Sequence, residues 1–204
     1  MVSTASDRST TNDGLYVRPA VDRAVKILIA GNLGVGKTTY VATLSEITPL
    51  RTDETMTEAG VGVDDLAGST TKATTTVAMD FGRLTLNNRL VLYLFGTPGQ
   101  PRFADMWHDL ASGALGALVL VDTRRLDESF AVLDRVDRLG LRHAVAVNRF
   151  DDAPPIDIGE VRHALDLEPG TPLVTCDARD RGSSAQALIT LTRHLLARAH
   201  QENV

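Results

Sequence analysis

The sequence feature that most constrains the fold is the run GNLGVGKT at residues 31–38, which follows the apolar stretch AVKILIAG. It matches the pattern G-x-x-x-x-G-K-[ST], whose glycines let backbone N–H groups surround phosphate oxygens at a helix N-terminus. The helical pattern GKTTYVATLSEI follows directly. A strand, this loop and a helix in that order predict a phosphate-binding loop made of Gly31, Asn32, Leu33, Gly34, Val35, Gly36, Lys37, Thr38 and Thr39.

Two side chains of this loop carry specific expectations. Lys37 is expected to reach the β- and γ-phosphate oxygens, and the Thr38 hydroxyl is expected to bind Mg²⁺. A chance glycine turn is the alternative, and the position between a strand and a helix argues against it.

Apolar runs alternate with helical patterns along the rest of the chain. The apolar runs predict strands at residues 76–86, 89–96, 114–122, 143–150 and 171–179. Helical patterns occupy residues 127–140, 157–167 and 183–201. This alternation predicts a three-layer α/β P-loop NTPase domain, with a mostly parallel sheet of about six strands and helices on both faces. Ligands of such a sheet bind at the carboxyl ends of its strands.

Two segments do not follow this alternation. Residues 1–20 are polar and rich in Ser, Thr and Asp, so they are predicted to be a disordered tail before a domain at residues 21–204. Residues 48–75 show no convincing period, and structureless segments of that length are usually functional or disordered.

The amino-acid composition indicates which kinds of partner the protein binds and in which cellular compartment it occurs. The formal net charge is −5 and there is no basic block, which argues against nucleic acid as a partner. Cys176 is the one cysteine, which excludes a disulfide framework and fits a reducing cytosol. Apolar runs fall far short of the roughly 20 residues that span a bilayer. A cytoplasmic protein without direct membrane insertion is expected.

The run VNRFD indicates which base is bound. Asn148 and Asp151 have the N-x-x-D spacing of a guanine reader and follow an apolar strand. The aspartate can accept hydrogen bonds from the N1 and N2 hydrogens of guanine, which adenine does not present in that pattern. Arg149 stands where lysine is usual, and its planar guanidinium can lie over a purine. Turn formation is the alternative role for these residues.

A second base loop is expected at TPLVTCDAR. Asp177, Ala178 and Arg179 end the last predicted strand. If Asp177 and Ala178 replace a usual Ser-Ala pair, the Ala178 N–H faces the guanine O6. An ordinary strand end is the alternative.

In the order of these motifs, residues 24–200 resemble the Ras-like small GTPases. The runs GTPGQ, NRFD and CDAR resemble more specifically the small GTPases of actinobacterial conservon operons, relatives of the polarity GTPase MglA. The resemblance implies a GTP-binding switch that needs Mg²⁺ and slowly hydrolyses GTP to GDP and phosphate. It also implies two partners, a roadblock/LC7-type regulator and a sensor-kinase-like protein that recruits the switch to the membrane.

The resemblance assigns roles by position. Residues 48–76 would form the first switch segment and residues 96–110 the second. Thr76 would bind Mg²⁺, with Thr75 as the fallback. Gly99 would contact the γ-phosphate, and Gln100 would orient the attacking water.

Catalytic and partner-binding candidates remain open. Arg51 and Arg102 are the internal arginines considered for catalysis. The stripe of Phe103, Met106, Trp107 and Leu110 has helical spacing and predicts core packing. The alternative is that Trp107 contacts a partner.

Gly96 is a departure from the template, which has a metal-binding aspartate there. Asp80 on the neighbouring strand is the candidate substitute. Otherwise Mg²⁺ binds through Thr38, Thr76 and phosphates alone, or hydrolysis is lost. Retention of Gln100 favours a slow GTPase, with a non-hydrolysing GTP/GDP-bound adaptor as the main alternative. A small-molecule phosphotransferase is disfavoured, because the arginine-rich lid is missing.

Overall fold

The computed structural model of the protein describes residues 23–56, 75–87, 89–99, 103 and 105–202. The strands are β1 (Arg23–Ala30), β2 (Leu50–Met56), β3 (Thr75–Thr85), β4 (Leu90–Gly96), β5 (Ala114–Val121), β6 (His143–Asn148) and β7 (Leu173–Cys176). The helices are α1 (Lys37–Leu44), α2 (Met106–Ala111), the 3-10 helix η2 (Thr123–Glu128), α3 (Ser129–Arg138), α4 (Ile158–Ala164) and α5 (Arg181–Glu202). The predicted tail at residues 1–20 lies outside the described residues.

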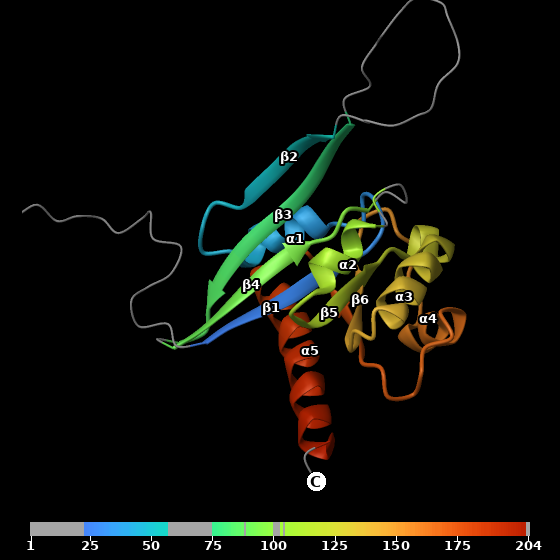
Figure 1. The fold of residues 1–204 in the computed structure, drawn as a ribbon. Coiled ribbons are helices and arrows are strands. Elements are labelled where there is room, and N and C mark those ends of the chain that lie inside the picture. The colour runs from blue at the N-terminus through green and yellow to red at the C-terminus, as the bar shows by residue number, and fades with distance from the viewer. Residues whose placement is uncertain (1–22, 57–74, 88, 100–102, 104, 203–204) are drawn as a thin grey trace, which may run out of the picture.

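All seven described strands form one sheet, in the order β2-β3-β4-β1-β5-β6-β7 (Figure 1). Strand β1 is parallel to β4 and β5, and β5, β6 and β7 continue in parallel. Strand β3 is antiparallel to both β2 and β4. The predicted class, a mostly parallel three-layer α/β fold, is confirmed.

The central strands are buried on both faces. Residues 27–30 of β1 and residues 117–121 of β5 are at most 1% exposed. Their sequences are continuous apolar runs without alternation, as expected for parallel strands covered by helices on both sides. These two strands therefore carry the centre of the hydrophobic core.

The helices divide the core into two layers. Tyr40 and Val41 of α1 and Leu191 of α5 pack on one face of the sheet. Trp107 of α2 and Val132 of α3 pack on the other, together with residues of α4. Figure 1 shows the same division, with the long helix α5 on a different side of the sheet from α3 and α4.

The stripe in the second predicted switch segment belongs to this core. Trp107 is 1% exposed and its indole N–H donates to the carbonyl oxygen of Pro98 at 3.3 Å. Phe103 and Leu110 are also buried, and Met106 is half-buried. The prediction of core packing is therefore confirmed, and the alternative of Trp107 as an exposed partner contact is not.

Strand β2 was not predicted from the sequence. It occupies Leu50–Met56, at the start of the segment without a period, and pairs with β3 at the edge of the sheet. Its sequence LRTDETM is mostly polar. Charged residues are typical of edge strands, where they oppose pairing with another chain. Residues 57–74 of the same segment lie outside the described residues.

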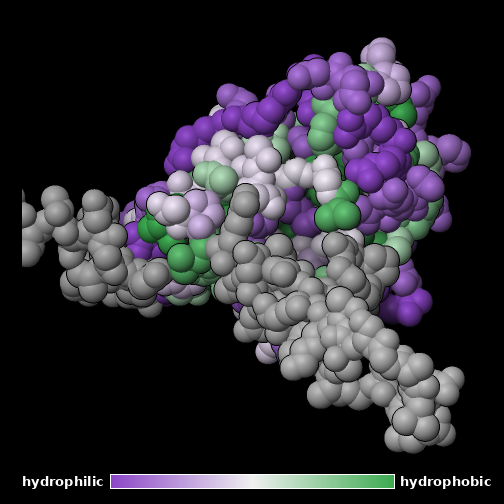
Figure 2. Space-filling model, turned by 90° about the horizontal axis from the view of Figure 1, so that it is seen from above, coloured by the Kyte–Doolittle hydropathy of each residue, from purple (hydrophilic) through white to green (hydrophobic). Residues whose placement is uncertain are grey.

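The described surface is largely hydrophilic. In the view of Figure 2, hydrophobic residues reach the surface in small separate groups. Leu33 and Leu196 are the most exposed large hydrophobic side chains, at 59% each. Within the described ranges, no helix has both the length and the apolar character needed to cross a membrane.

Candidate nucleotide-binding site

The loop between β1 and α1 has the backbone that the glycine pattern predicts. Gly31, Gly34 and Gly36 have φ values of 144°, 78° and 103°, which favour glycine. Helix α1 begins directly after Gly36, so its first N–H groups point toward the interior of the loop. The carboxyl ends of β4 and β5 flank the carboxyl end of β1.

Gly36→Ala is expected to destabilise the protein by about 2–5 kcal/mol. The left-handed backbone costs about 1–2 kcal/mol and overpacking about 1–3 kcal/mol. A Cβ at this position would lie 2.5 Å from Nδ2 of Asn148, a buried side chain. Urea unfolding measures the change. Gly140→Ala is the matched control, because Gly140 also has a positive φ but a Cβ there meets nothing within 4 Å. Equal losses in the two variants would contradict the packing argument.

Lys37 lies inside the loop as a nearly buried cation. The side chain is 8% exposed, and Nζ donates to the carbonyl oxygens of Gly31 at 2.7 Å and Asn32 at 2.6 Å. Burial lowers the pKa of Lys37 to about 8, and the charge of Asp80 partly opposes this shift. Neutral carbonyl groups compensate a positive charge less well than anionic oxygens do. The loop therefore holds a cation suited to phosphate oxygens.

Thr38 and Asp80 meet beside the loop. The Thr38 hydroxyl donates to Oδ2 of Asp80 at 2.5 Å, and Asp80 is 7% exposed. Asp80 lies opposite Gly96 in the antiparallel pairing of β3 with β4. A Cβ built on Gly96 would lie 3.1 Å from Cβ and 3.2 Å from Oδ2 of Asp80. The Asp80 carboxylate therefore occupies space that a side chain at position 96 would need.

The hydroxyl of Thr38 and the carboxylate of Asp80 fit a magnesium site. Mg²⁺ prefers oxygen ligands and usually takes few protein ligands, because substrate phosphates and water complete its coordination. Within the described residues, no group of three or more His, Cys, Asp and Glu side chains could hold a metal ion. The donor set thus fits Mg²⁺ bound together with a nucleotide better than a metal held by protein alone.

The predicted magnesium ligand Thr76 lies elsewhere along β3. Thr76 pairs with Thr55 of β2 and precedes Asp80 by four residues. Four residues of a strand span about 13 Å, so the backbone of Thr76 is far from Asp80 along β3. Thr75 lies one residue further along and pairs with Met56. Either threonine would reach the Thr38 site only if this end of β3 left its pairing with β2.

The segment after β4 lies directly against the phosphate-binding loop. A Cβ on Gly99 would be 2.6 Å from the backbone nitrogen of Leu33, 2.8 Å from the carbonyl carbon of Asn32 and 2.8 Å from Nζ of Lys37. Glycine is therefore required at position 99 for this close approach. Gln100 and Arg102 lie outside the described residues, as does the side chain of Arg51, so their predicted roles stay predictions.

Asn148 connects the phosphate-binding loop to the second base loop. Its Nδ2 donates to the carbonyl oxygen of Val35 at 2.9 Å, and its Oδ1 accepts from the Ala178 N–H at 3.0 Å. Asn148 is 4% exposed. The N–H that was expected to face guanine O6 is thus bound to Asn148 in this structure, and a base oxygen would have to share it.

Arg179 bridges the two predicted base-contacting carboxylates. Its guanidinium donates to both oxygens of Asp151 at 2.9 and 3.0 Å and to both oxygens of Asp177 at 2.9 Å. Arg179 lowers the pKa of Asp177 to about 2 and also lowers the pKa of Asp151. The Asp151 side chain is 85% exposed, so solvent screens this pair and its displacement costs little. Asp151 therefore already accepts a planar pair of N–H groups.

Two neighbouring arginines were not identified from the sequence as site residues. Arg124 donates to both oxygens of Asp152 at 2.6 and 2.7 Å, and its guanidinium carbon lies 3.8 Å from the centroid of the Phe150 ring. Arg125 donates to the Leu33 carbonyl oxygen at 3.1 Å. Arg124 therefore contacts the loop after β6, which contains Phe150 and Asp152. Arg125 contacts the phosphate-binding loop. The pair RR directly after an apolar strand and Asp122 is the sequence signal that could have identified them.

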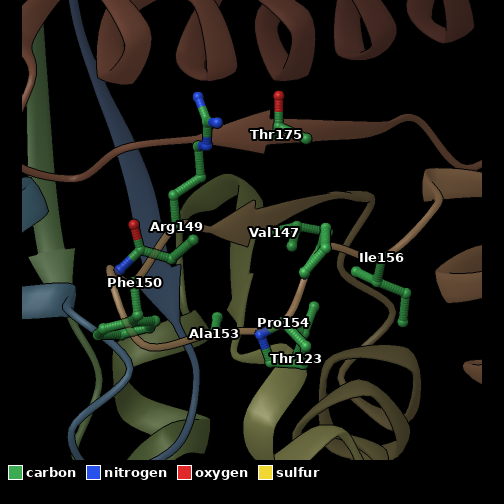
Figure 3. Close-up of a pocket in the computed structure, with 10 residues that line it drawn as sticks. Thr123, Val147, Arg149, Phe150, Ala153, Pro154, Ile156 and Thr175 are labelled. Carbon is green, nitrogen blue, oxygen red and sulfur yellow. The ribbon is translucent and has the colours of Figure 1, made fainter.

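A hollow of about 460 Å³ lies next to the base loop (Figure 3). The ends of β6 and β7, the loop that follows β6 and the start of η2 line it, through Thr123, Val147, Asn148, Arg149, Phe150, Ala153, Pro154, Pro155, Ile156 and Thr175. Asp151 and Ala178 are not among these residues. The hollow therefore includes Asn148 and Arg149 of the predicted base-contacting residues but not Asp151 or Ala178.

A glycine loop that encloses a lysine at the carboxyl edge of a mostly parallel sheet defines a class, the P-loop nucleotide-binding proteins. Within that class, the family described as "Conserved hypothetical ATP binding protein" matches residues 29–158, and the chain belongs to this family. A relative from the archaeon Methanocaldococcus jannaschii, the uncharacterized protein MJ1339, is 28% identical over 139 residues. That alignment covers 67% of this chain and 77% of the relative.

These matches correct the expected family. The resemblance to the Ras-like small GTPases, and to the conservon-type group within them, is wrong as an assignment, because the matching family is the ATP-binding one. The physical reason is that short motifs report local chemistry. A phosphate-binding loop and polar residues after β6 and β7 are requirements of nucleotide binding at this sheet edge, which distinct families share.

Proposed function

We propose that the protein binds GTP together with Mg²⁺, hydrolyses it slowly to GDP and phosphate, and binds other proteins according to its nucleotide state. The observation that carries this proposal is the Asp80 carboxylate at 2.5 Å from the Thr38 hydroxyl, beside Gly96. It supports a metal site in which the Asp80 carboxylate on β3 binds Mg²⁺ in place of an aspartate at position 96.

In this proposal, different described residues bind the phosphates and the Mg²⁺ ion. Lys37 exchanges its two carbonyl contacts for phosphate oxygens, which hold its charge more strongly. Thr38 and Asp80 are the residues that would hold Mg²⁺, which supplies charge neutralisation on the transferred phosphoryl group. Gln100 as the residue that orients water stays a prediction. Slow turnover is expected without an arginine directed at the γ-phosphate, because such an arginine is worth roughly 10³–10⁵ in rate in these enzymes. Arg51 and Arg102 as its source stay predictions.

The choice of GTP over ATP rests on Asp151. This carboxylate accepts two N–H groups from one edge of the Arg179 guanidinium, and guanine presents a similar pair from N1 and N2. Adenine presents an acceptor at N1, which a carboxylate repels. The description of the family refers to ATP. A comparison of GTP binding with ATP binding is therefore the most direct test of the proposed base preference.

Asp151→Ala is expected to weaken GTP binding by roughly 10- to 100-fold and to leave ATP binding within about twofold, because hydrogen bonds to a charged group contribute about 1.5–3 kcal/mol. Calorimetric titration of both nucleotides with Mg²⁺ measures the change. Asp152→Ala is the matched control, since Asp152 is the adjacent carboxylate and binds Arg124 instead. Tighter binding of ATP than of GTP by the unaltered protein would contradict the proposed base preference.

A second candidate function is a GTP/GDP-bound adaptor that does not hydrolyse. Gly96 favours it, because the chain has no aspartate at the position where the small-GTPase template holds the Mg²⁺ hydration shell. Tight binding without turnover is the expected behaviour of such an adaptor. The expectations of a roadblock/LC7-type regulator, a sensor-kinase-like partner and a cytoplasmic location stay predictions.

A further inference from the structure

The start of η2 contacts both the phosphate-binding loop and the loop after β6. Asp122, the residue before η2, accepts from the Arg124 N–H at 3.0 Å and so caps this short helix. The backbone of η2 departs from helical geometry at Arg125, where φ is −144° and ψ is 51°. This kink lets two adjacent side chains, Arg124 and Arg125, reach different loops.

Both arginines contact the carboxylate of Asp122. Arg124 donates to its two oxygens at 2.9 and 2.7 Å, and NH2 of Arg125 lies 3.5 Å from Oδ2. The Asp122 side chain is 3% exposed. Burial by itself would raise the pKa of Asp122, but the hydrogen bonds from Arg124 and the charges of both arginines lower it overall. A buried carboxylate that stays charged is thus a common anchor for the two arginines.

Arg124 extends from this anchor to the loop after β6. Its guanidinium donates to both oxygens of Asp152 and lies over the ring of Phe150. Asp151, the carboxylate proposed to accept from the base, is the residue between these two. Arg124 therefore holds the loop on both sides of Asp151.

Arg125 extends to the phosphate-binding loop. Its NH2 donates to the carbonyl oxygen of Leu33 at 3.1 Å, and a Cβ on Gly34 would lie 3.4 Å from the same nitrogen. Its NH1 lies 3.4 Å from Oε2 of Glu128. The peptide bond between Leu33 and Gly34 is trans, so its C=O and N–H groups point in opposite directions. A donor that holds the Leu33 C=O therefore directs the Gly34 N–H away from Arg125.

Asn148 holds another peptide group of the loop in a similar way. Its Nδ2 donates to the carbonyl oxygen of Val35 at 2.9 Å, and the N–H of that peptide group belongs to Gly36. The peptide groups that carry the Gly34 and Gly36 N–H are thus both held at the carbonyl oxygen by side chains from outside the loop. Phosphate-binding loops of this kind surround phosphate oxygens with backbone N–H groups, so the direction of these groups matters for binding.

We propose that Arg124 and Arg125 are positioning residues of the nucleotide site. Arg125 directs the Gly34 N–H toward the nucleotide phosphates, and Arg124 holds the loop that carries Asp151. Their common anchor, Asp122, keeps the two loops at the separation that one nucleotide spans. The inference rests on nucleotide binding at this site, and it is independent of the choice of base and of hydrolysis.

Calorimetric titration of the intact chain with pyrophosphate and Mg²⁺ tests Arg125 without a base. Arg125→Met keeps an unbranched side chain but removes every donor. It is expected to weaken pyrophosphate binding about tenfold, the result of a loop that is correctly oriented about a tenth of the time. Arg138→Met is the matched control, because Arg138 is exposed and pairs with Asp134 on α3. The control is expected to bind pyrophosphate within about twofold of the unaltered protein.

Arg124 is tested by titrating GDP and ADP in parallel with pyrophosphate. Arg124→Met is expected to weaken the tighter-bound nucleotide about tenfold and pyrophosphate by less than about threefold, because Arg124 holds the loop that meets the base. Using the tighter of the two nucleotides makes the result independent of base preference. A general loss of stability would weaken nucleotide and pyrophosphate by equal factors, and that outcome would overturn the role of Arg124.

Amide chemical shifts measured by NMR at saturating pyrophosphate test the orientation of the loop directly. The Gly34 and Gly36 N–H signals of the unaltered protein are expected to shift as they donate to phosphate oxygens. Arg125→Met is expected to reduce the shift at Gly34 and to preserve it at Gly36, whose peptide group Asn148 holds. Equal reduction at both glycines, or a loss of affinity no greater than in Arg138→Met, would overturn the role of Arg125. Absence of pyrophosphate binding by the unaltered protein would instead refute the phosphate-binding loop itself, and the positioning role with it.

Discussion

Lys37→Ala is expected to weaken the binding of GTP by roughly 100- to 1,000-fold. The substitution removes the buried cation of the phosphate-binding loop, and two charge-assisted hydrogen bonds to phosphate oxygens are together worth about 3–4 kcal/mol. Displacement of a fluorescent GDP analogue at fixed Mg²⁺ measures the loss. The folded state is expected to persist, because burial of Lys37 is itself unfavourable for its charge, as the lowered pKa shows.

The control for this experiment is Lys26→Ala. Lys26 is on β1 and donates to the carbonyl oxygen of Ser112, away from the loop. Its removal is expected to leave nucleotide affinity within about twofold. A loss of less than threefold in Lys37→Ala, with the protein still folded, would show that the loop does not bind phosphates through this lysine.

Asp80→Asn is expected to raise the Mg²⁺ concentration needed for half-maximal GTP binding by roughly 10- to 100-fold, the usual range for loss of a group that supports a metal site. The amide keeps the size of the side chain and can still accept from Thr38, so the effect isolates the negative charge. Magnesium titrations at constant nucleotide measure it. An unchanged magnesium requirement would remove Asp80 from the metal site.

A paired substitution separates the carboxylate from its position in the chain. Gly96→Asp alone is expected to destabilise the protein, because the new Cβ lies 3.2 Å from the Asp80 carboxylate and brings a second negative charge. Asp80→Gly combined with Gly96→Asp removes both the close contact with the side chain at position 80 and the second negative charge, and is expected to recover most of the magnesium affinity that Asp80→Gly loses. If the double variant binds Mg²⁺ no better than Asp80→Gly alone, the pairing of positions 80 and 96 does not allow a carboxylate at one position to replace a carboxylate at the other.

The sequence was most informative where local rules are strict. The glycine pattern around Lys37 predicted both the loop and the start of α1, because glycines with positive φ and a helix N-terminus leave few alternatives. The apolar runs predicted the central strands, since strands buried on both faces must be apolar throughout. Asp80 was identified as a substitute for the residue missing at position 96 because neighbouring strands place side chains side by side.

The edge strand β2 and the contacts between side chains far apart in the sequence were less predictable from the sequence. The polar strand β2 has no period that distinguishes it from a loop, because its stability comes from pairing with β3. The contacts of Arg125 with Leu33, and of Arg179 with Asp151, join residues 92 and 28 positions apart. No local pattern encodes such distances. The family was misassigned for a related reason, since the motifs record the chemistry of phosphate and base recognition, which several families share.

Single-turnover hydrolysis of GTP, with ATP in parallel, at several Mg²⁺ concentrations tests the proposed function most directly. Slow, Mg²⁺-dependent conversion of GTP to GDP that exceeds the conversion of ATP, and that requires more Mg²⁺ in Asp80→Asn, is the expected result. Tight binding of GTP without any conversion at saturating Mg²⁺, or conversion of ATP in preference to GTP, would contradict a GTP-hydrolysing switch.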